Sequence, residues 1–244
     1  FLGDNGFSWG EHRYSAKNCA YEPCVRVPLT VLDPRPPTRA RAVDALTVDR
    51  FEAIEDWFAE EGKRHGVRLT RPVEVQIARP LTAIPPAPPY GGHPLEVMLW
   101  SLQLRWWVWQ HADTEGPAPH VKLFLPYHDP RLTNAVPHSV GLREGMVGVV
   151  HVYADRGQAA QNLVVATHEL LHTLGATDKY DPATNLPLFP DGYAEPARGP
   201  AAAQDFAEIM AGRTPVATGQ AEMPSGLDAT LVGTVTAREI GWGR

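Results

Sequence analysis

Two histidines and a glutamate share one short apolar segment whose spacing suits metal chemistry. The segment reads Q-N-L-V-V-A-T-H-E-L-L-H-T-L and contains His168, Glu169 and His172. Side chains four residues apart project from the same face of a helix, so both imidazoles could bind one ion. Glu169 would stand beside them, within reach of a water on that ion. The pattern is typical of a zinc site in which the glutamate acts as a general base.

The residues that follow predict the end of this helix and a third ligand. Gly175 comes three residues after His172, where a left-handed conformation can end a helix. Asp178 comes three residues later and could reach the same ion. Two histidines and a carboxylate leave a fourth position for water, as in catalytic rather than structural zinc sites. The alternatives for the third ligand are carboxylates further along the chain: Asp181, Glu195 and Glu208.

The motif H-E-L-L-H-T-L-G-A-T-D at residues 168–178 resembles that of the metzincin clan of zinc endopeptidases, in the variant with Asp as third ligand. The continuation D-K-Y and the later G-Y-A-E-P at residues 192–196 are distantly similar to bacterial families of the IgA-peptidase type. The resemblance implies a metzincin-like α/β (α+β) fold. That fold would have a mixed twisted sheet, an active-site helix and a loop-rich C-terminal subdomain.

The same resemblance implies the roles of the site residues. One catalytic Zn2+ would be bound by His168, His172 and Asp178, with Glu169 as general base. Met210, within E-I-M-A-G, would form the Met-turn, a hydrophobic floor beneath the metal. The implied activity is that of a zinc metalloendopeptidase, which hydrolyses a protein or peptide substrate with a metal-activated water. Two alternatives stay open, a zinc-containing binding module and a zinc hydrolase of non-peptide amides.

Substrate contacts are expected on the strand at 146–153, just before the active-site helix. By the resemblance this strand is an edge, to which an extended peptide could add through main-chain hydrogen bonds. An ordinary interior strand is the alternative. Tyr180 and Tyr193 could donate to a developing oxyanion, or could pack and bond locally. The expected substrate-binding residues are Val149, His151 and Tyr193.

Hydrophobic periodicity predicts the elements that must position these residues. Apolar residues at helical spacing predict a helix over 46–65, ended near Gly66. Alternation and β-branched residues predict strands over 73–78, 121–125 and 146–153. A Thr cap at Thr236 with Glu239 three residues on predicts a short terminal helix.

Residues 95–111 predict a further helix, rich in tryptophan. One stripe of this helix is apolar, so the segment is predicted to be buried or to dock on another element. The alternatives are a place at a membrane interface or along a substrate groove. Polar residues interrupt the run, which excludes a membrane-spanning helix. The stripe consists of Leu95, Met98, Leu99, Leu102, Trp106 and Trp109.

Composition bounds the architecture and the partners. The chain has 244 residues, with 24 Pro, 21 Gly and a net charge of −6, which indicates a loop-rich globular protein and argues against nucleic acid as a partner. Residues 1–45 are predicted to form an irregular N-terminal arm. Residues 46–244 are predicted to form the catalytic domain, divided into an upper part at 46–175 and a C-terminal subdomain at 176–244. The oligomeric state stays open.

The resemblance to peptidases also gives an expectation for the cellular location, and the loop residues give one for further cofactors. Peptidases of this kind are commonly exported, so a secreted, periplasmic or membrane-anchored setting is expected, with weak support from the start at Phe1. Membrane association could come from a preceding N-terminal segment or from the tryptophan-rich helix. Cys19 and Cys24 could form a disulfide or remain thiols. Ca2+ could bind among loop carboxylates: Asp181, Asp191, Glu195 and Asp205.

Overall fold

A mixed β-sheet forms the centre of the computed structural model, which describes residues 26–32, 48–69, 71–78, 81–89, 93–112, 120–132 and 135–242. Its strands follow the order β2-β1-β3-β5-β4, and β6 pairs with the end of β3. All these pairs are parallel except β4 with β5. The α/β (α+β) class is therefore confirmed. The strands are β1 (Arg26–Leu32), β2 (Glu74–Ile77), β3 (Lys122–His128), β4 (Val140–Leu142), β5 (Val147–Val149) and β6 (Val152–Tyr153).

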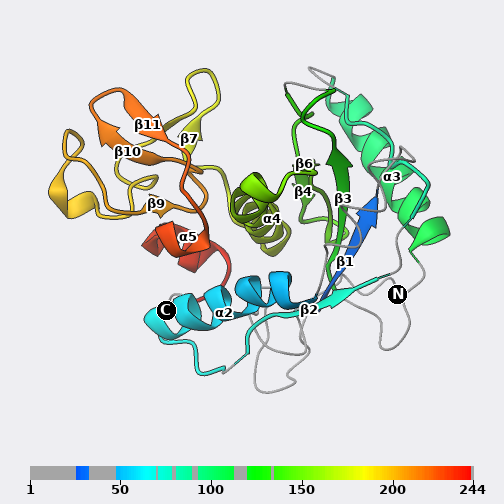
Figure 1. Cartoon of the computed structure of the whole chain (residues 1–244), viewed down its shortest axis with the longest axis horizontal. Coiled ribbons are helices and arrows are strands. Elements are labelled where there is room, and N and C mark those ends of the chain that lie inside the picture. Colours follow the sequence, from blue (N-terminus) through cyan, green and yellow to red (C-terminus); the bar gives the residue numbers. More distant parts are fainter. Residues whose placement is uncertain are drawn as a thin grey trace.

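Helices cover both faces of this sheet (Figure 1). Helix α3 (Pro94–His111) lies on one face, and α2 (Val48–Arg64) and α4 (Ala159–Leu174) lie on the other. Side chains of β3 alternate between two hydrophobic cores, as the period of a strand requires. Leu123 and Leu125 join the core with α2 and α4, whereas Phe124 joins the core with α3.

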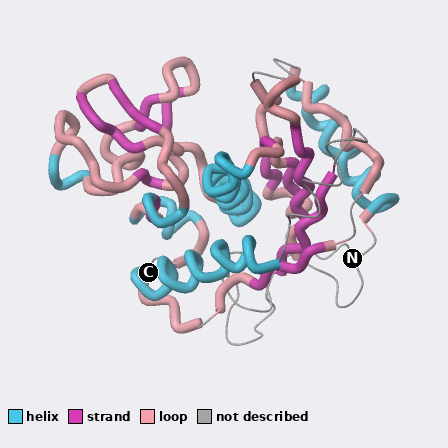
Figure 2. The backbone as a smooth tube through the Cα atoms, in the orientation of Figure 1, coloured by secondary structure: helices cyan, strands magenta, loops and turns pink. Residues whose placement is uncertain are grey.

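The part of the chain after α4 is rich in loops, as the coloured tube in Figure 2 shows. Its short strands pair as β7 (Tyr180–Asp181) with β8 (Leu186–Pro187), β9 (Ala207–Glu208) with β12 (Thr230–Leu231), and β10 (Thr214–Ala217) with β11 (Gln220–Glu222). Short 3-10 turns are η3 (Arg156–Gln158), η4 (Pro196–Arg198) and η5 (Leu227–Ala229).

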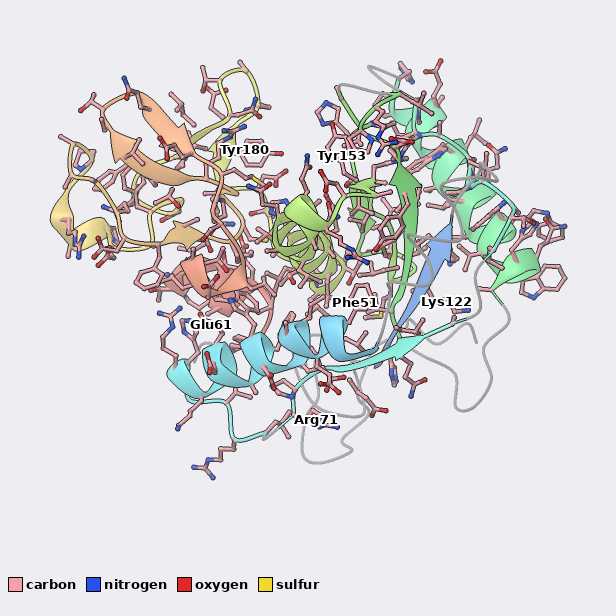
Figure 3. The ribbon with its side chains drawn as sticks, in the orientation of Figure 1. Phe51, Glu61, Arg71, Lys122, Tyr153 and Tyr180 are labelled. Carbon is pink, nitrogen blue, oxygen red and sulfur yellow. The ribbon has the colours of Figure 1, made fainter. Side chains whose placement is uncertain are left out.

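The end of the chain returns to α2 and shares its core. Trp242 is buried, and its ring meets that of Phe58 edge-on, with centroids 5.7 Å apart. The Val232 N–H donates to the carboxylate of Glu61 over 2.6 Å. Figure 3 shows Glu61 on the side of α2 that faces this C-terminal segment. The final segment therefore stabilises the same core that supports the sheet.

The predicted irregular arm at 1–45 is wrong for one segment. Residues Arg26–Leu32 form β1, which lies between β2 and β3 inside the sheet. Pro28 hides this strand from sequence reading, because proline is unusual in the interior of a sheet. The alternation of Val27, Leu29 and Val31 around it is the signal that could have revealed the strand. Cys19 and Cys24 lie outside the described residues.

Helix α3 forms as predicted but buries a different face. Trp100, Leu104 and Val108 point into the core against β3 and β5. The predicted stripe is instead exposed, up to 73% at Trp109 and 61% at Leu99. Apolar residues occur all around this helix, so periodicity could not choose the buried side. Within the described part of the chain, no helix has both the length and the apolar character needed to cross a membrane.

The terminal helix begins earlier than predicted. Helix α5 spans Thr234–Glu239 with Gly233 as its N-cap, and no side chain caps it. Thr236 therefore lies inside the helix, fully buried, where its hydroxyl donates to Glu208 over 2.7 Å. The predicted capping box is wrong because both of its polar side chains bind residues distant in the sequence. Glu239 reaches the loop at residues 177–179.

Candidate metal centre

Helix α4 and the loop after it bring three ligand atoms together. Nε2 of His168 and Nε2 of His172 lie 3.0 Å apart, and each lies 3.2 Å from Oδ1 of Asp178. Zinc–ligand bonds of about 2.0–2.1 Å at tetrahedral angles would separate neighbouring ligands by about 3.3 Å. The triangle therefore has the size of one face of a zinc coordination shell. Among the described residues, these three are the only group of His, Cys, Asp or Glu able to hold a metal ion.

Backbone carbonyls fix both imidazoles in the tautomer that a metal needs. Nδ1 of His168 lies 2.9 Å from the carbonyl oxygen of Ile209, and Nδ1 of His172 lies 2.9 Å from that of Ala176. A carbonyl only accepts, so each Nδ1 carries the hydrogen and donates. With a metal ion bound, each Nε2 would present its lone pair to the centre of the triangle, the arrangement that orients histidine ligands in metalloproteins.

The predicted turn after the helix is confirmed. Gly175 caps α4 with φ of 108°, a left-handed conformation that favours glycine. The Ala176 N–H donates back to Leu171 over 3.0 Å, which places the Ala176 carbonyl on the His172 ring. The same turn carries the chain to Asp178. Gly175 therefore positions two of the three candidate ligands.

Charge around the triangle favours a cation at its centre. Burial would lower the pKa of His168, but the hydrogen bond to Asp178 and the charge of Glu169 raise this pKa to about 9. Burial would raise the pKa of Asp178, but hydrogen bonds to the two imidazoles hold it well below its usual range. Without a metal ion, His168 therefore carries a proton at neutral pH beside the ionised Asp178. A divalent cation would replace that proton, so metal binding competes with protonation.

Glu169 lies beside the triangle as a buried, incompletely paired carboxylate. Glu169 is only 6% exposed, and its Oε2 has no hydrogen-bond partner within the described structure. Burial raises the pKa of this carboxyl, an effect that the neighbouring imidazoles and a backbone bond from Gly141 oppose. A raised pKa and an orphaned oxygen suit a group that exchanges a proton with water at the metal.

Two further residues lie at the site: Gly141, which had no clear signal in the sequence, and Tyr180, for which the sequence left two roles open. A Cβ at Gly141 would lie 2.3 Å from the carbonyl oxygen of Glu169, so only glycine lets β4 lie this close to α4. Tyr180 hydrogen bonds to Asp178, and burial with the nearby negative charges raises the pKa of its phenol. Tyr180 therefore lies at the triangle, and its role as a donor to an oxyanion stays a prediction. Figure 3 shows Tyr180 and Tyr153 projecting from the two parts of the chain on either side of α4.

The segment around Met210 supports the triangle from below. Met210 is fully buried in the core shared with α4, and the carbonyl of the preceding Ile209 orients His168. Glu208 fixes this turn with four hydrogen bonds and is itself fully buried. It is therefore not a metal ligand. Its carboxylate accepts from the backbone of Met210 and Ala211, the backbone of Gly233 and the hydroxyl of Thr236.

Replacing Glu208 by Ala is expected to destabilise the protein by about 3–5 kcal/mol. The variant leaves four donors buried without an acceptor, the kind of loss that costs most in a protein interior. Urea unfolding of wild type and variant measures the difference in free energy of unfolding. Glu60→Ala, an exposed glutamate on α2, is the control and is expected to stay within about 0.5 kcal/mol of wild type. A similar small change for Glu208→Ala would contradict this role.

The predicted substrate strand is not the edge of the sheet. Val149 is buried in β5, between β3 and β4, so β4 forms this edge. An extra strand after 139 had not been expected, because Val140–Leu142 is only three residues long. Tyr193 packs its ring on Phe189 and donates to the Pro200 carbonyl over 3.3 Å. The structure does not join Val149 or Tyr193 to the triangle.

The loop carboxylates proposed for Ca2+ are not gathered into one group. Glu195 and Asp205 both pair with Arg198, and Asp181 accepts from the Ala183 backbone within the β7–β8 turn. Asp181 and Glu195, the alternative third ligands, therefore bond elsewhere and are not part of the triangle. Asp178 is the carboxylate that the fold brings to the two histidines.

His151, the third expected substrate residue, pairs with another histidine. Its Nδ1 lies 2.8 Å from Nε2 of His128, at the ends of β5 and β3. Burial and the neighbouring His128 lower the pKa of His151 to about 4. The His151 ring is therefore uncharged at neutral pH, and a hydrogen bond joins it to His128.

Acidification is expected to break this histidine pair. The folded pKa of about 4 lies below the ordinary 6.5, first because of burial and then because of His128, so stability is at its full value above pH 6.5 and falls as the pH drops from 6.5 through 4. NMR titration of the His151 ring should give a midpoint near 4, and His128→Asn should raise it. A midpoint near 6.5 in wild type would contradict the pairing.

Comparisons with known proteins add little to this geometry. No protein-family model matches the chain, and no curated protein matches it. Among solved structures, it is similar to wild-type OgpA from Akkermansia muciniphila, with 15% sequence identity and a TM-score of 0.31. The match covers 69% of this chain and 52% of OgpA, so the chain spans about half the length of that protein. The His168–His172–Asp178 group, which could hold a metal ion, therefore carries the functional argument.

Proposed function

We propose that this chain is a zinc-dependent endopeptidase with His168, His172 and Asp178 as metal ligands and Glu169 as general base. One observation carries the proposal: three lone-pair atoms converge within 3.2 Å beside a buried carboxylate oxygen that has no partner among the described residues. Two imidazoles and one carboxylate form the ligand set of catalytic zinc sites, which keep a position for water or substrate. The metzincin-like motif supports the same proposal.

The reaction needs a Lewis acid and a base on adjacent groups. When bound, zinc would polarise the scissile carbonyl and lower the pKa of water to about 7. Glu169 would take the proton of the attacking water and return it to the leaving amine. Burial raises the pKa of this carboxyl above the ordinary value, which favours the first step, the uptake of the proton. Asp178 would stay ionised as a ligand, because a carboxylate binds a metal ion in its deprotonated form.

The edge strand β4 supports a peptide as the substrate. Its partner β5 lies on one side, and its other side has no pairing among the described strands. Gly141, at the centre of β4, lies against the backbone of Glu169, so a peptide added to this edge would pass beside the triangle. Main-chain pairing at an edge selects for extended peptides with little side-chain discrimination.

A peptide library tests this function. The zinc-loaded full chain is incubated with peptides from a digested proteome, and mass spectrometry identifies new termini. Internal cuts that a chelator abolishes and zinc restores are the expected result. A protein that binds one equivalent of zinc but makes no cuts in peptides would contradict the peptidase function. Release of small acids or amines from non-peptide amides would then favour the alternative hydrolase.

A further inference from the structure

Glu239, in the last turn of α5, binds both neighbours of the proposed third ligand. Its carboxylate accepts from the backbone and the hydroxyl of Thr177, over 3.0 and 2.8 Å. It also accepts from Nζ of Lys179 over 2.8 and 3.0 Å. Asp178 lies between these two residues. We call Glu239, Thr177 and Lys179 the Glu239 clamp.

The clamp is built around a buried cation. Lys179 is only 5% exposed, and its ammonium also donates to the carbonyl and hydroxyl of Thr177 over 2.7 Å. A lysine is rarely buried this far unless a carboxylate pairs with it. The Lys179 backbone N–H donates to the Met210 carbonyl over 2.9 Å, which ties the same residue to the turn beneath His168. The loop is therefore held on two sides.

Asp178 itself has few other contacts within the described part of the chain. Its side chain is 44% exposed, and its bonding partners among the described residues are the two imidazoles and Tyr180. The two histidines sit on a regular helix, whereas Asp178 sits in the loop between α4 and β7. Groups that hold the surroundings of a ligand reduce the ordering that metal binding requires, and losing them lowers metal affinity.

We propose that Glu239 is a positioning residue for Asp178, and that the Glu239 clamp sets the affinity of the site for a divalent transition-metal ion. This inference rests on the metal centre proposed above. Glu239 lies some sixty residues from the loop and touches none of the three ligands. It acts by fixing the backbone on both sides of Asp178. Its removal should therefore matter only while Asp178 is present to bind the metal.

A double-mutant cycle on the full chain separates this role from a general effect on folding. Zinc affinity is measured by competition with a chromophoric chelator for wild type, Glu239→Gln, Asp178→Ala and the double variant. Glu239→Gln is expected to weaken zinc binding about 10- to 100-fold in the wild-type background. In the Asp178→Ala background the same change is expected to have less than about a twofold effect. Glu60→Gln, an exposed glutamate on α2, is the control for the loss of one carboxylate.

Three results would overturn the proposal. Equal losses of zinc affinity from Glu239→Gln in both backgrounds would show that Glu239 only stabilises the fold. A loss below about twofold from Glu239→Gln, with a clear loss from Asp178→Ala, would reject the clamp alone. Unchanged zinc affinity in Asp178→Ala would show that the metal centre itself is wrong.

A second variant keeps the test valid if Glu239→Gln does not fold. Thr177→Val removes the hydroxyl that donates to Glu239 and accepts from Lys179, and it leaves the ion pair between Glu239 and Lys179 in place. Thr177 is exposed, so the fold should tolerate the change. About fivefold weaker zinc binding is expected, because the variant loses the bonds of one hydroxyl while the ion pair and the backbone bond of the clamp remain, and again only with Asp178 present. Absorption spectra of the cobalt-loaded proteins should change in the same variants, and unchanged spectra would contradict the proposal.

Discussion

Replacing His172 by Ala is expected to weaken zinc binding about 100- to 1000-fold. A zinc site with four ligands gains roughly 10–16 kcal/mol at neutral pH, so one ligand accounts for about 3–4 kcal/mol. The variant removes one corner of the triangle and leaves His168 and Asp178 in place. Alanine favours the helical conformation, so α4 should persist. Competition with a chelator of known affinity measures the change.

An exposed histidine provides the matched control for this variant. His138→Ala makes the same chemical change just before β4, at a residue outside the triangle. Its zinc affinity is expected to equal that of wild type. If His172→Ala and His138→Ala bound zinc equally well, the metal would be bound elsewhere in the chain.

The second large effect is expected for Glu169→Gln, which should lower turnover about 100- to 10,000-fold while leaving zinc bound. Glutamine has the shape of glutamate but cannot accept a proton from water, and general-base catalysis contributes rate factors of this size. The rate of cleavage of a peptide found in the library screen measures the effect. The zinc content of the same sample shows whether the metal is retained.

Two outcomes would reject Glu169 as the base. Full turnover in Glu169→Gln would show that another group accepts the proton. Loss of zinc from the variant would show that Glu169 supports the metal rather than the reaction. Glu169 is buried in α4, so thermal unfolding of the variant must also show that the helix is intact.

Local spacing explains why the triangle could be predicted. The separation of His168 and His172 by four residues fixes their shared face on any helix. Gly175 marks the end of that helix through its backbone freedom, and the short distance along the chain to Asp178 limits where the third ligand can lie. These relations depend on neighbours within about ten residues, and all three are present in the structure.

Features that depend on distant parts of the chain could not be predicted in this way. Glu208 and Glu239 bind residues about 25 and 60 positions away, and no periodic pattern marks such pairs. The buried side of α3 depends on the shape of the sheet beneath it, because apolar side chains occur on both sides of the helix. The place of β4 at the edge depends on the pairing order of the whole sheet.

Several expectations stay predictions about the wider biology of the chain. These are the location outside the cytoplasm, the peptide sequence cleaved and any contact of the tryptophan-rich helix with a membrane. Cys19 and Cys24 lie outside the described residues, and thiolate ligation of the metal by either is a specific alternative to the proposed shell. A measurement of the atoms around the bound metal distinguishes the two directly.

Zinc K-edge X-ray absorption on the full chain loaded with one equivalent of zinc tests the central claim. The expected result is a shell of nitrogen and oxygen atoms at about 2.0–2.1 Å, with the multiple scattering of two imidazoles. The same spectrum from His172→Ala should lose one imidazole contribution. A sulfur atom at about 2.3 Å, or a spectrum without imidazole scattering, would contradict a metal centre formed by His168, His172 and Asp178.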